Sequence, residues 1–389
     1  QRPRDPHRDD GRGLRRLQAR GRDFIGADAD PVPGNGGEPS TLAGGCAHWP
    51  LPIWRRTHHA NKREDIMKRS LIIAACLAVF GLPLSTVAQT DWPQKPVTMV
   101  VPYPPGGVND AVARAYANKL AVELGKPILI DNRAGAGTTV ASNYVAKAPA
   151  DGYTIYAGGT SLVINPTLTG QVQYDPNKSF DLVSLMSFTP FILHVNSEFP
   201  ARNMAELIAH VKANPGKFNI ASSGIGATNH LIAELLKMQA GLNMTHVPYK
   251  GGAQAGQDVA SGQAQMMFSA ALEAKPVIAT GKTRAIAITS AGRVPAFPDI
   301  PTVGEATGMK DFVVVFWQGM VVPAGTPRPI VDKLEKAIAK VAADPEMIER
   351  FKPQGVEIRA STQAEFKDYM GKEELRWKKQ IKERNIKPE

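Results

Sequence analysis

Two loops of small residues carry the chemistry that this sequence can be expected to perform. The first follows the apolar run 97–102 and leads into a helical stretch. Glycines in such a turn let backbone N–H groups approach a ligand closely, and the first N–H groups of the next helix attract anions. The predicted ligand contacts of this turn are Tyr103, Gly106, Gly107 and Asp110. Asp110 could equally serve only as a cap for the helix that it begins.

The second loop spans residues 222–230 and repeats the order of strand, small-residue turn and helix. It is not a dinucleotide-binding fingerprint, because Asn229 stands where the third glycine is required. What remains is a cradle of hydroxyl and amide groups suited to an anion. The predicted contacts are Ser222, Ser223, Gly224, Gly226, Thr228 and His230. His230 fits a helix-packing role at least as well.

Other short segments supply polar groups near the ends of predicted strands. Glycines precede Thr160 and Ser161, and Tyr249 precedes two further glycines across Lys250. We predict that Thr160, Ser161, Tyr249 and Ser269 also contact the ligand, whereas Lys250 is expected to be a solvated surface charge. Side chains that choose among ligands are expected away from the anion cradle, and the candidates are Phe188, Phe268 and Ser269.

Catalytic and metal-binding patterns are weak in this chain. The sequence contains no G-x-S-x-G elbow and no H-E-x-x-H pair, and no acidic cluster has metal-ligand spacing. We therefore expect neither an enzyme nor a metal site, and no cofactor. The alternative from another class is a serine hydrolase that uses Ser222 or Ser223 with His230.

Short β-rich runs alternate with helical stretches after residue 96, which indicates an α/β protein. The predicted strands are 97–102, 127–131, 154–157, 191–195, 218–221, 245–248, 264–268, 284–289 and 313–322. The predicted helices are 110–124, 204–214, 228–240, 327–343 and 362–383, with Asn203 as an N-cap and Gly125 and Gly241 as C-terminal stops. Ligands of such folds bind at the carboxyl ends of strands, where the polar loops lie.

The N-terminal part differs from the rest of the sequence. Residues 1–66 are rich in Arg, Gly, Asp and Pro without apolar periodicity, and we interpret them as upstream sequence outside the native protein or as a disordered tail. Met67 then opens a basic and apolar segment with small residues before Ala88, the pattern of a signal peptide over 67–88 cut after Ala88. The apolar run 71–84 is too short for a transmembrane anchor. Lipidation at Cys76 is a further alternative.

Cleavage after Ala88 would change the charge and the cysteine content. Residues 1–88 hold 14 of the 46 Lys and Arg and 9 of the 36 Asp and Glu, so the net charge falls from +10 to +5. Both cysteines, Cys46 and Cys76, lie in this region. The mature chain is thus expected to lack disulfides and thiolate sites, and nucleic-acid binding loses most of its support.

Taken together, the motifs from about Trp92 to Pro388 resemble the periplasmic substrate-binding proteins of tripartite tricarboxylate transporters, or Bug-type receptors. The resemblance rests on residues 102–110, 131–137, 150–154, 222–230 and 247–251, on Asp258, on 298–302 with Glu305, and on Trp317 with Gly319. The chain departs from the family at Ala134 and Ala150, where proline is usual.

The resemblance implies a two-lobed, type II-like periplasmic binding protein, with two mixed sheets flanked by helices and a hinge cleft. It implies that each glycine-rich loop holds one carboxylate group of a small organic ligand through backbone amides and bridging waters. The expected lobes are 89–193 with 317–389, and 194–316. A monomer that passes its ligand to membrane transporter subunits is expected, or alternatively a module that feeds a sensor kinase.

Overall fold

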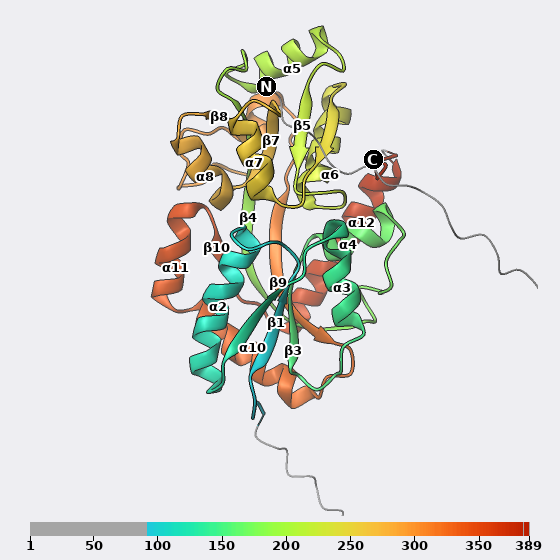
Figure 1. The fold of residues 1–389 in the computed structure, drawn as a ribbon, viewed down its shortest axis with the longest axis vertical. Coiled ribbons are helices and arrows are strands. Elements are labelled where there is room, and N and C mark those ends of the chain that lie inside the picture. Colours follow the sequence, from blue (N-terminus) through green and yellow to red (C-terminus); the bar gives the residue numbers. More distant parts are fainter. Residues whose placement is uncertain (1–91, 384, 389) are drawn as a thin grey trace, which may run out of the picture. The chain divides into compact units, whose positions relative to one another are not determined.

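The computed structural model describes residues 92–383 and 385–388. Helices and strands alternate along this part of the chain, as the sequence predicts for an α/β protein (Figure 1). The predicted upstream segment 1–66 and signal peptide 67–88 lie outside the described residues, and so do the apolar run 71–84 and the alternative lipidation site Cys76.

One lobe is built on parallel strands near the start of the described chain. Strand β1 pairs in parallel with β2 on one side and with β3 on the other. The elements are β1 (Val97–Val101), α2 (Val108–Leu124), β2 (Ile128–Asn132), η1 (Ala136–Thr138), α3 (Thr139–Ala146), β3 (Thr154–Gly159) and α4 (Ser161–Leu168). Because parallel strands end at the same edge, the loops after β1 and β3 meet there, which brings residues 103–107 close to Thr160.

The other lobe repeats this arrangement with a second set of elements. Strand β5 pairs in parallel with β6 and β7. The elements are α5 (Met204–Ala213), β5 (Asn219–Ser222), α6 (Thr228–Ala240), β6 (Thr245–Pro248), α7 (Gly252–Ala260), β7 (Met266–Ala270), α8 (Ala271–Ala279), β8 (Thr283–Ile288) and α9 (Val303–Thr307). The second polar loop, between β5 and α6, therefore lies at the carboxyl edge of this sheet.

Two long strands connect the lobes. Strand β4 (Phe180–Asn196) pairs with β9 (Val315–Pro323) as far as Pro190, and from Phe191 onward it pairs with β7 and β8. Sharing β4 makes the two halves one continuous ten-stranded mixed sheet. This confirms the predicted periplasmic-binding-protein class, but the two expected sheets are one sheet because β4 runs through both halves. The proposed lobe limits at 193/194 and 316/317 fall within these two strands.

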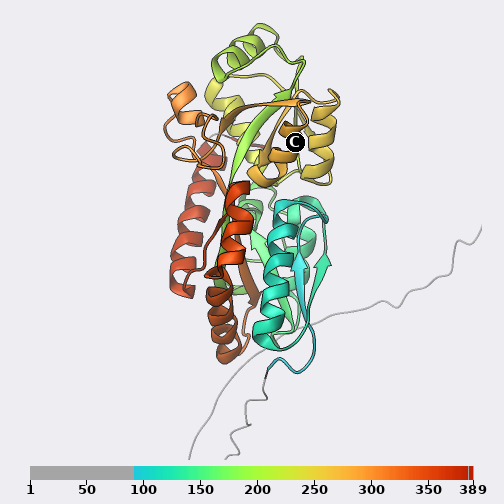
Figure 2. The ribbon, with the colours of Figure 1, turned by 90° about the vertical axis from the view of Figure 1, so that its left-hand side faces the viewer.

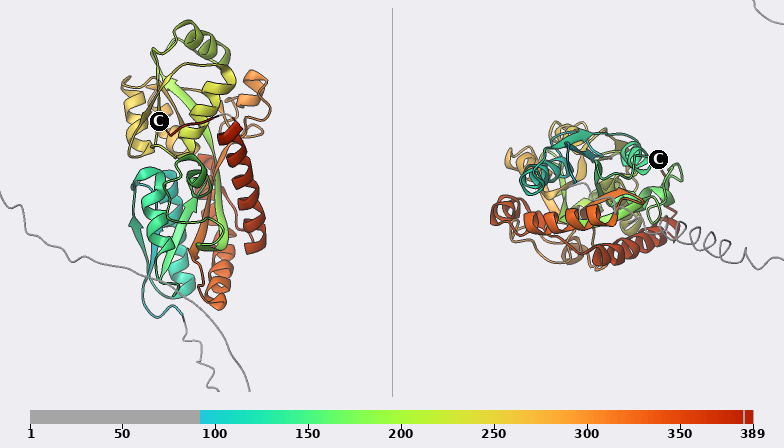
Figure 3. Two further views of the ribbon diagram at one scale, coloured as in Figure 1. Left: turned by 90° about the vertical axis from the view of Figure 1, so that its right-hand side faces the viewer. Right: turned by 90° about the horizontal axis from the view of Figure 1, so that it is seen from below.

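The C-terminal elements return to the first lobe. Helix α10 (Arg328–Ala342) packs on β4 and α2, and α12 (Gln363–Glu383) packs on β4 and α4. Between them lie α11 (Pro345–Phe351), η2 (Lys352–Gln354) and β10 (Glu357–Ile358), which pairs with β4. Helix α10 therefore lies beside α2 and α12 beside α4, and Figures 2 and 3 show these red and orange helices along the first lobe.

The helix signals in the sequence are largely confirmed. Asn203 accepts a hydrogen bond from the Glu206 backbone N–H at 2.9 Å, and α6 ends at Gly241 with a left-handed φ of 62°. Helix α2 starts at Val108, two residues before the predicted start, because Gly107 acts as its N-cap. Helices α3, α4, α7, α8, α9 and α11 were not predicted with bounds.

Strand β4 is longer than the sequence predicts, since only 191–195 was expected and the strand begins at Phe180. Its first half contains buried hydroxyl residues, among them Ser184, Ser187 and Thr189, and the register with β9 shifts twice. Ser184 is paired with the backbone of Ser361. Polar residues satisfied by distant partners hide the apolar pattern of a strand.

The apolar core lies between the sheet and its helices in both lobes. On α2, Val112, Tyr116 and Leu120 recur at helical spacing and are fully buried. Each such side chain contributes roughly 1.5–3 kcal/mol by leaving water. These contacts fix α2 on the sheet and thereby aim its N-terminus at the other lobe.

Candidate functional site

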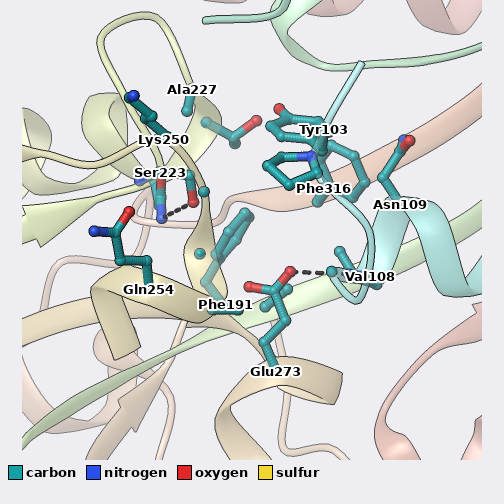
Figure 4. Close-up of a pocket in the computed structure, with 18 of the residues that line it drawn as sticks. Tyr103, Val108, Asn109, Phe191, Ser223, Ala227, Lys250, Gln254, Glu273 and Phe316 are labelled. Carbon is teal, nitrogen blue, oxygen red and sulfur yellow. Dashed lines mark hydrogen bonds between the residues drawn. The ribbon is translucent and has the colours of Figure 1, made fainter. Parts of the chain in front are cut away.

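A cavity of about 340 Å³ lies between the two lobes, beside the strands that connect them (Figure 4). It is lined by residues of the loops after β1, β5 and β6, by the first turns of α2, α6, α7 and α8, and by one residue each of β4, β7 and β9. These residues are Tyr103, Pro104, Pro105, Gly107, Val108, Asn109, Phe191, Ser223, Ala227, Thr228, Asn229, Lys250, Gly251, Gly252, Ala253, Gln254, Ala270, Glu273 and Phe316. Its size is at the lower end for small-molecule sites.

The α2 loop is held in shape by Asp110. The backbone N–H of Gly106 donates to Asp110 Oδ2 at 3.0 Å, and Asn132 Nδ2 donates to Oδ1 at 2.8 Å. Arg114 Nε donates to Oδ2 at 2.9 Å. Burial alone would raise the pKa of this carboxyl, but these hydrogen bonds outweigh it and lower the pKa. Asp110 thus stays ionised and fixes Gly106, whose φ is +94°.

The α6 loop is built in the same way from different residues. The backbone N–H of Gly226 donates to His230 Nδ1 at 3.3 Å, four residues on, as Gly106 does to Asp110. Asn229 Nδ2 donates to the Phe268 carbonyl on β7, and Asn109 Nδ2 makes the same bond to the Ala157 carbonyl on β3. Both lobes therefore present the start of a helix, held by an equivalent bond on each side, to one cavity.

His230, in the first turn of α6, is uncharged. Burial lowers its pKa to about 3, helped by His246 and Lys237. Its ring stacks on that of His246 with centroids 4.2 Å apart. An uncharged ring can accept the Gly226 N–H, which a protonated one could not do.

The two helix starts differ in what faces them. Glu273, from the first turn of α8 in the other lobe, accepts a hydrogen bond from the Val108 backbone N–H through Oε1 at 2.8 Å (Figure 4). Thr228 occupies the matching place on α6, where its hydroxyl is buried and has no hydrogen-bond partner among the described residues. Among the described residues no side chain caps the start of α6, because its N-cap residue is Ala227, and uncapped N–H groups at a helix start attract anions.

The walls between these ends are apolar and aromatic. Tyr103 and Phe316 meet edge to face, with ring centroids 6.2 Å apart, and Phe191 lies between the two ends in Figure 4. The Tyr103 hydroxyl is hydrogen-bonded to Ser161 Oγ at 3.3 Å. Burial raises the pKa of Tyr103 to about 12, and the charge of Glu273 adds to this, so the phenol stays neutral.

A second contact between the lobes lies beside the cavity. Asn165 Nδ2 donates to the Gly137 carbonyl, and a Cβ at Gly137 would strike the Ile225 carbonyl. A Cβ at Gly226 would strike Asn165 Oδ1. Glycines at these two positions let the lobes approach each other this closely.

The structure places the residues predicted to bind ligand in two groups. Tyr103, Gly107, Ser223 and Thr228 line the cavity. The other predicted residues are not among those that line the cavity. They are Gly106, Asp110, Thr160, Ser161, Ser222, Gly224, Gly226, His230, Tyr249 and Ser269. Thr160 Oγ1 accepts from the Trp317 N–H, and Ser269 is hydrogen-bonded to His194 Nε2.

The predicted selectivity residues also lie elsewhere. Phe188 packs against Tyr369, and Phe268 is buried against Phe312. The cavity takes its aromatic side chains from Phe191 and Phe316 instead.

Several residues that line the cavity were not singled out from the sequence. Glu273 is the most consequential, and as the third residue of α8 it has the sequence context of an ordinary helix-start acid. Phe191 and Phe316 lie within strands and read as core residues. Lys250, expected to be a solvated charge, is exposed but also lines the cavity. Only the position of Phe191 near a strand end gave any signal.

The serine–histidine pair differs from the one predicted for a hydrolase. Ser222 Oγ lies 2.6 Å from Nε2 of His246, whereas His230 uses its Nδ1 for the Gly226 N–H. Ser222 is fully buried and does not line the cavity. The cavity-lining Ser223 is bound to Asn229.

Metal binding and membrane crossing were the two other properties to consider in residues 92–383 and 385–388. In the part of the chain that the structure describes, no group of three or more His, Cys, Asp or Glu side chains could hold a metal ion. Within the same residues, no helix is long and apolar enough to cross a membrane.

Comparison with known proteins identifies the family. Residues 112–386 match the family described as tripartite tricarboxylate transporter family receptor. The chain belongs to this receptor family. A relative from Pseudomonas sp. (strain P51), the UPF0065 protein in the tcbD-tcbE intergenic region, is 34% identical over 84% of this chain and 98% of its own length.

Solved structures of similar proteins share the fold of this receptor. The periplasmic binding protein BugD has a TM-score of 0.73 with 36% identity, over 76% of this chain and 99% of its own. Rpa4515 of R. palustris, solved with adipate, has a TM-score of 0.74 with 32% identity over 77% and 100%. MatC of Rhodopseudomonas palustris, solved with malate, has a TM-score of 0.71 with 32% identity over 74% and 99%. The family is one of periplasmic binding receptors rather than of enzymes.

Proposed function

We propose that this receptor captures a small organic carboxylate between its lobes and delivers it to the membrane subunits of a tripartite tricarboxylate-type transporter. The observation that carries the proposal is the start of α6, where a buried Thr228 hydroxyl without a partner among the described residues joins free helix N–H groups at the cavity. A carboxylate would satisfy all of these donors at once. Two similar proteins were solved with carboxylates, adipate and malate.

Closure of the lobes is part of this function. The bond between Glu273 and Val108 and the close approach of Gly137 to Ile225 both join one lobe to the other. A bound ligand that contacts both lobes favours the closed arrangement by its extra contacts there. Transporter subunits would recognise this closed form, and the receptor is proposed to act as a monomer.

Export is the second element of the proposal. The pattern at 67–88 directs the chain to the periplasm with Gln89 as its first residue, and the lobes are then 89–193 with 317–389, and 194–316. Intact-mass analysis of the protein purified from the periplasm tests this directly. A mass corresponding to residues 89–389 supports cleavage after Ala88, and a diacylated N-terminus at Cys76 contradicts it.

Binding is tested with ligand-stripped protein. Native mass spectrometry of the freshly purified protein identifies any retained carboxylate, and calorimetry with a panel of mono- and dicarboxylates then measures affinity. We expect stoichiometric binding without turnover, weakened in Thr228→Val. Complete silence across the panel would refute the proposal. Hydrolysis of an ester that is lost in His246→Ala would favour the hydrolase, because His246 is the histidine that contacts Ser222.

The choice between transporter and sensor kinase needs a cellular test. Deletion of the gene should abolish uptake of the retained ligand. Loss of induction with uptake intact would assign the receptor to a sensor instead.

A further inference from the structure

Glu273 occupies the place where a ligand carboxylate would be expected in the first lobe. Its Oε1 accepts the Val108 N–H at the start of α2, the bond that a bound anion would make there. A Cβ at Gly107 would lie 2.9 Å from this oxygen, and a Cβ at Gly252, at the start of α7, would strike Oε2. The carboxylate thus fills the space between two helix starts, and glycines leave it that room.

The opposite end of the cavity has the complementary character. Thr228, only 2% exposed, offers a hydroxyl without a partner among the described residues beside the free N–H groups of α6. Lys250 also lines the cavity, and Figure 4 shows it with Ala227 on the side away from Glu273. One end therefore attracts a carboxylate, while the other presents an acidic side chain of the protein itself.

We propose that Glu273 makes this cavity selective for monocarboxylates that carry an N–H donor at their far end, and that it selects against dicarboxylates. The ligand carboxylate binds at Thr228 and the α6 start, and the N–H group donates to Glu273. A second ligand carboxylate would face Glu273 across a cavity of about 340 Å³, where like charges repel strongly. This inference rests on the proposed function and names the ligand class of the same site.

The surroundings of Glu273 favour a further hydrogen-bond donor to its carboxylate. Burial raises the pKa of the Glu273 carboxyl, which the Val108 N–H only partly offsets. A carboxylate with one hydrogen bond in such a place gains more from a second donor than a solvated one does. An ammonium or amide N–H from the ligand supplies it.

Calorimetry with matched ligands tests the proposal. The probes are succinate, succinamate and 4-aminobutyrate, together with the six-carbon set of adipate, its monoamide and 6-aminohexanoate, so that only the group at the far end varies. We expect ligand-stripped wild-type protein to bind an N–H probe at least about tenfold more tightly than the dicarboxylate of the same length. The amide and ammonium arms show which donor is preferred.

The variant Glu273→Gln keeps an oxygen for the Val108 N–H but removes the charge. We expect it to bind the dicarboxylate at least about tenfold more tightly than the wild type does, which abolishes or reverses the preference. Glu273→Ser provides a second neutral variant, should the glutamine variant not fold by its melting curve. Glu349→Gln, an exposed residue on α11, controls for the change in net charge and should leave the preference unchanged.

The possible outcomes separate the two proposals. Equal or tighter binding of the dicarboxylates to wild-type protein, or a preference that is unchanged in both Glu273 variants, overturns the role of Glu273 and leaves carboxylate capture intact. Failure of every carboxylate to bind either wild-type protein or the neutral variants refutes the proposed function and the inference with it.

Discussion

The starts of α2 and α6 are two versions of one design. Each has a glycine with positive φ whose N–H is held by the side chain four residues on, Asp110 in one lobe and His230 in the other. They differ at the first helical residue: the Val108 N–H is already bonded to Glu273, while the Thr228 hydroxyl has no partner within the described part of the chain. Two helix starts with the same local hydrogen bonds can therefore bind different ends of a ligand. Glu273, from α8, occupies the start of α2 and leaves the start of α6 available to a ligand.

The largest expected loss of ligand affinity follows substitution of Gly226 by alanine, and it distinguishes Gly226 from its counterpart Gly106. Both have positive φ, +82° and +94°, so alanine strains either loop by about 1–2 kcal/mol. Only at Gly226 would the new methyl also strike Asn165 across the lobes, since nothing lies within 4 Å at Gly106. We expect Gly226→Ala to weaken ligand binding about 100-fold, as measured by calorimetry.

Gly106→Ala is the matched control for this variant. It should lower the melting temperature but change affinity less than about tenfold, because its cost is backbone strain alone. Equal losses of affinity in the two variants would mean that the contact of Gly226 with Asn165 does not govern closure.

The next largest effect on ligand affinity is expected when the first residues of α2 and α6, Val108 and Thr228, are each changed toward the other. Thr228→Val removes a hydroxyl that would donate to the ligand carboxylate, which is worth about 1.5–3 kcal/mol or roughly ten- to a hundredfold in affinity. Stability should hold or rise, since the hydroxyl has no partner among the described residues. Calorimetry and a melting curve measure the two quantities separately.

Val108→Thr is the opposite change, and we expect little effect on affinity because Glu273 already faces that position. An affinity loss as large in Val108→Thr as in Thr228→Val would remove the distinction between the two helix starts.

The last effect is on stability rather than on affinity, and it concerns the residues that hold the two glycines. The pKa of His230 is lowered from 6.5 to about 3, chiefly by burial. Its neutral ring therefore contributes full stability above pH 6.5, and this contribution is lost as the pH falls from 6.5 toward 3. The loss reaches up to about 1.4 kcal/mol per pH unit, because the unfolded chain takes up the proton first.

Urea unfolding between pH 7 and pH 4 measures this slope. His230→Asn keeps an acceptor for Gly226 but does not titrate, so its stability should fall less steeply over this range. Some slope remains, because burial also lowers the pKa of His194, to about 4. A variant slope identical to that of the wild type would show that His230 is not the neutral component of the loop.

The sequence predicted what local patterns determine. The glycine-rich loops, the Asn203 cap and the stops at Gly125 and Gly241 follow from neighbouring residues, whereas the two-lobed class followed from the resemblance to the receptor family. It did not predict the first half of β4, where the buried Ser184 is hydrogen-bonded to the backbone of Ser361, far along the chain.

The cavity shows the same limit. Thr228 and Ser223 could be chosen from their own loop, but the choice of Ser269 and Tyr249 could not be checked without knowing which way each strand faces. Glu273 was not predicted, because acidic residues are common in the first turn of a helix, where they interact favourably with the helix dipole. Its partner Val108 is 165 residues away in the sequence. Contacts between lobes leave no trace in local spacing.

A crystal structure of the protein with 4-aminobutyrate tests the central claim most directly. We expect the ligand carboxylate to lie within hydrogen-bonding distance of Thr228 Oγ1 and the first N–H groups of α6, with the ammonium group against Glu273. A carboxylate bonded to the Val108 N–H instead, with Glu273 turned out of the cavity, would contradict it.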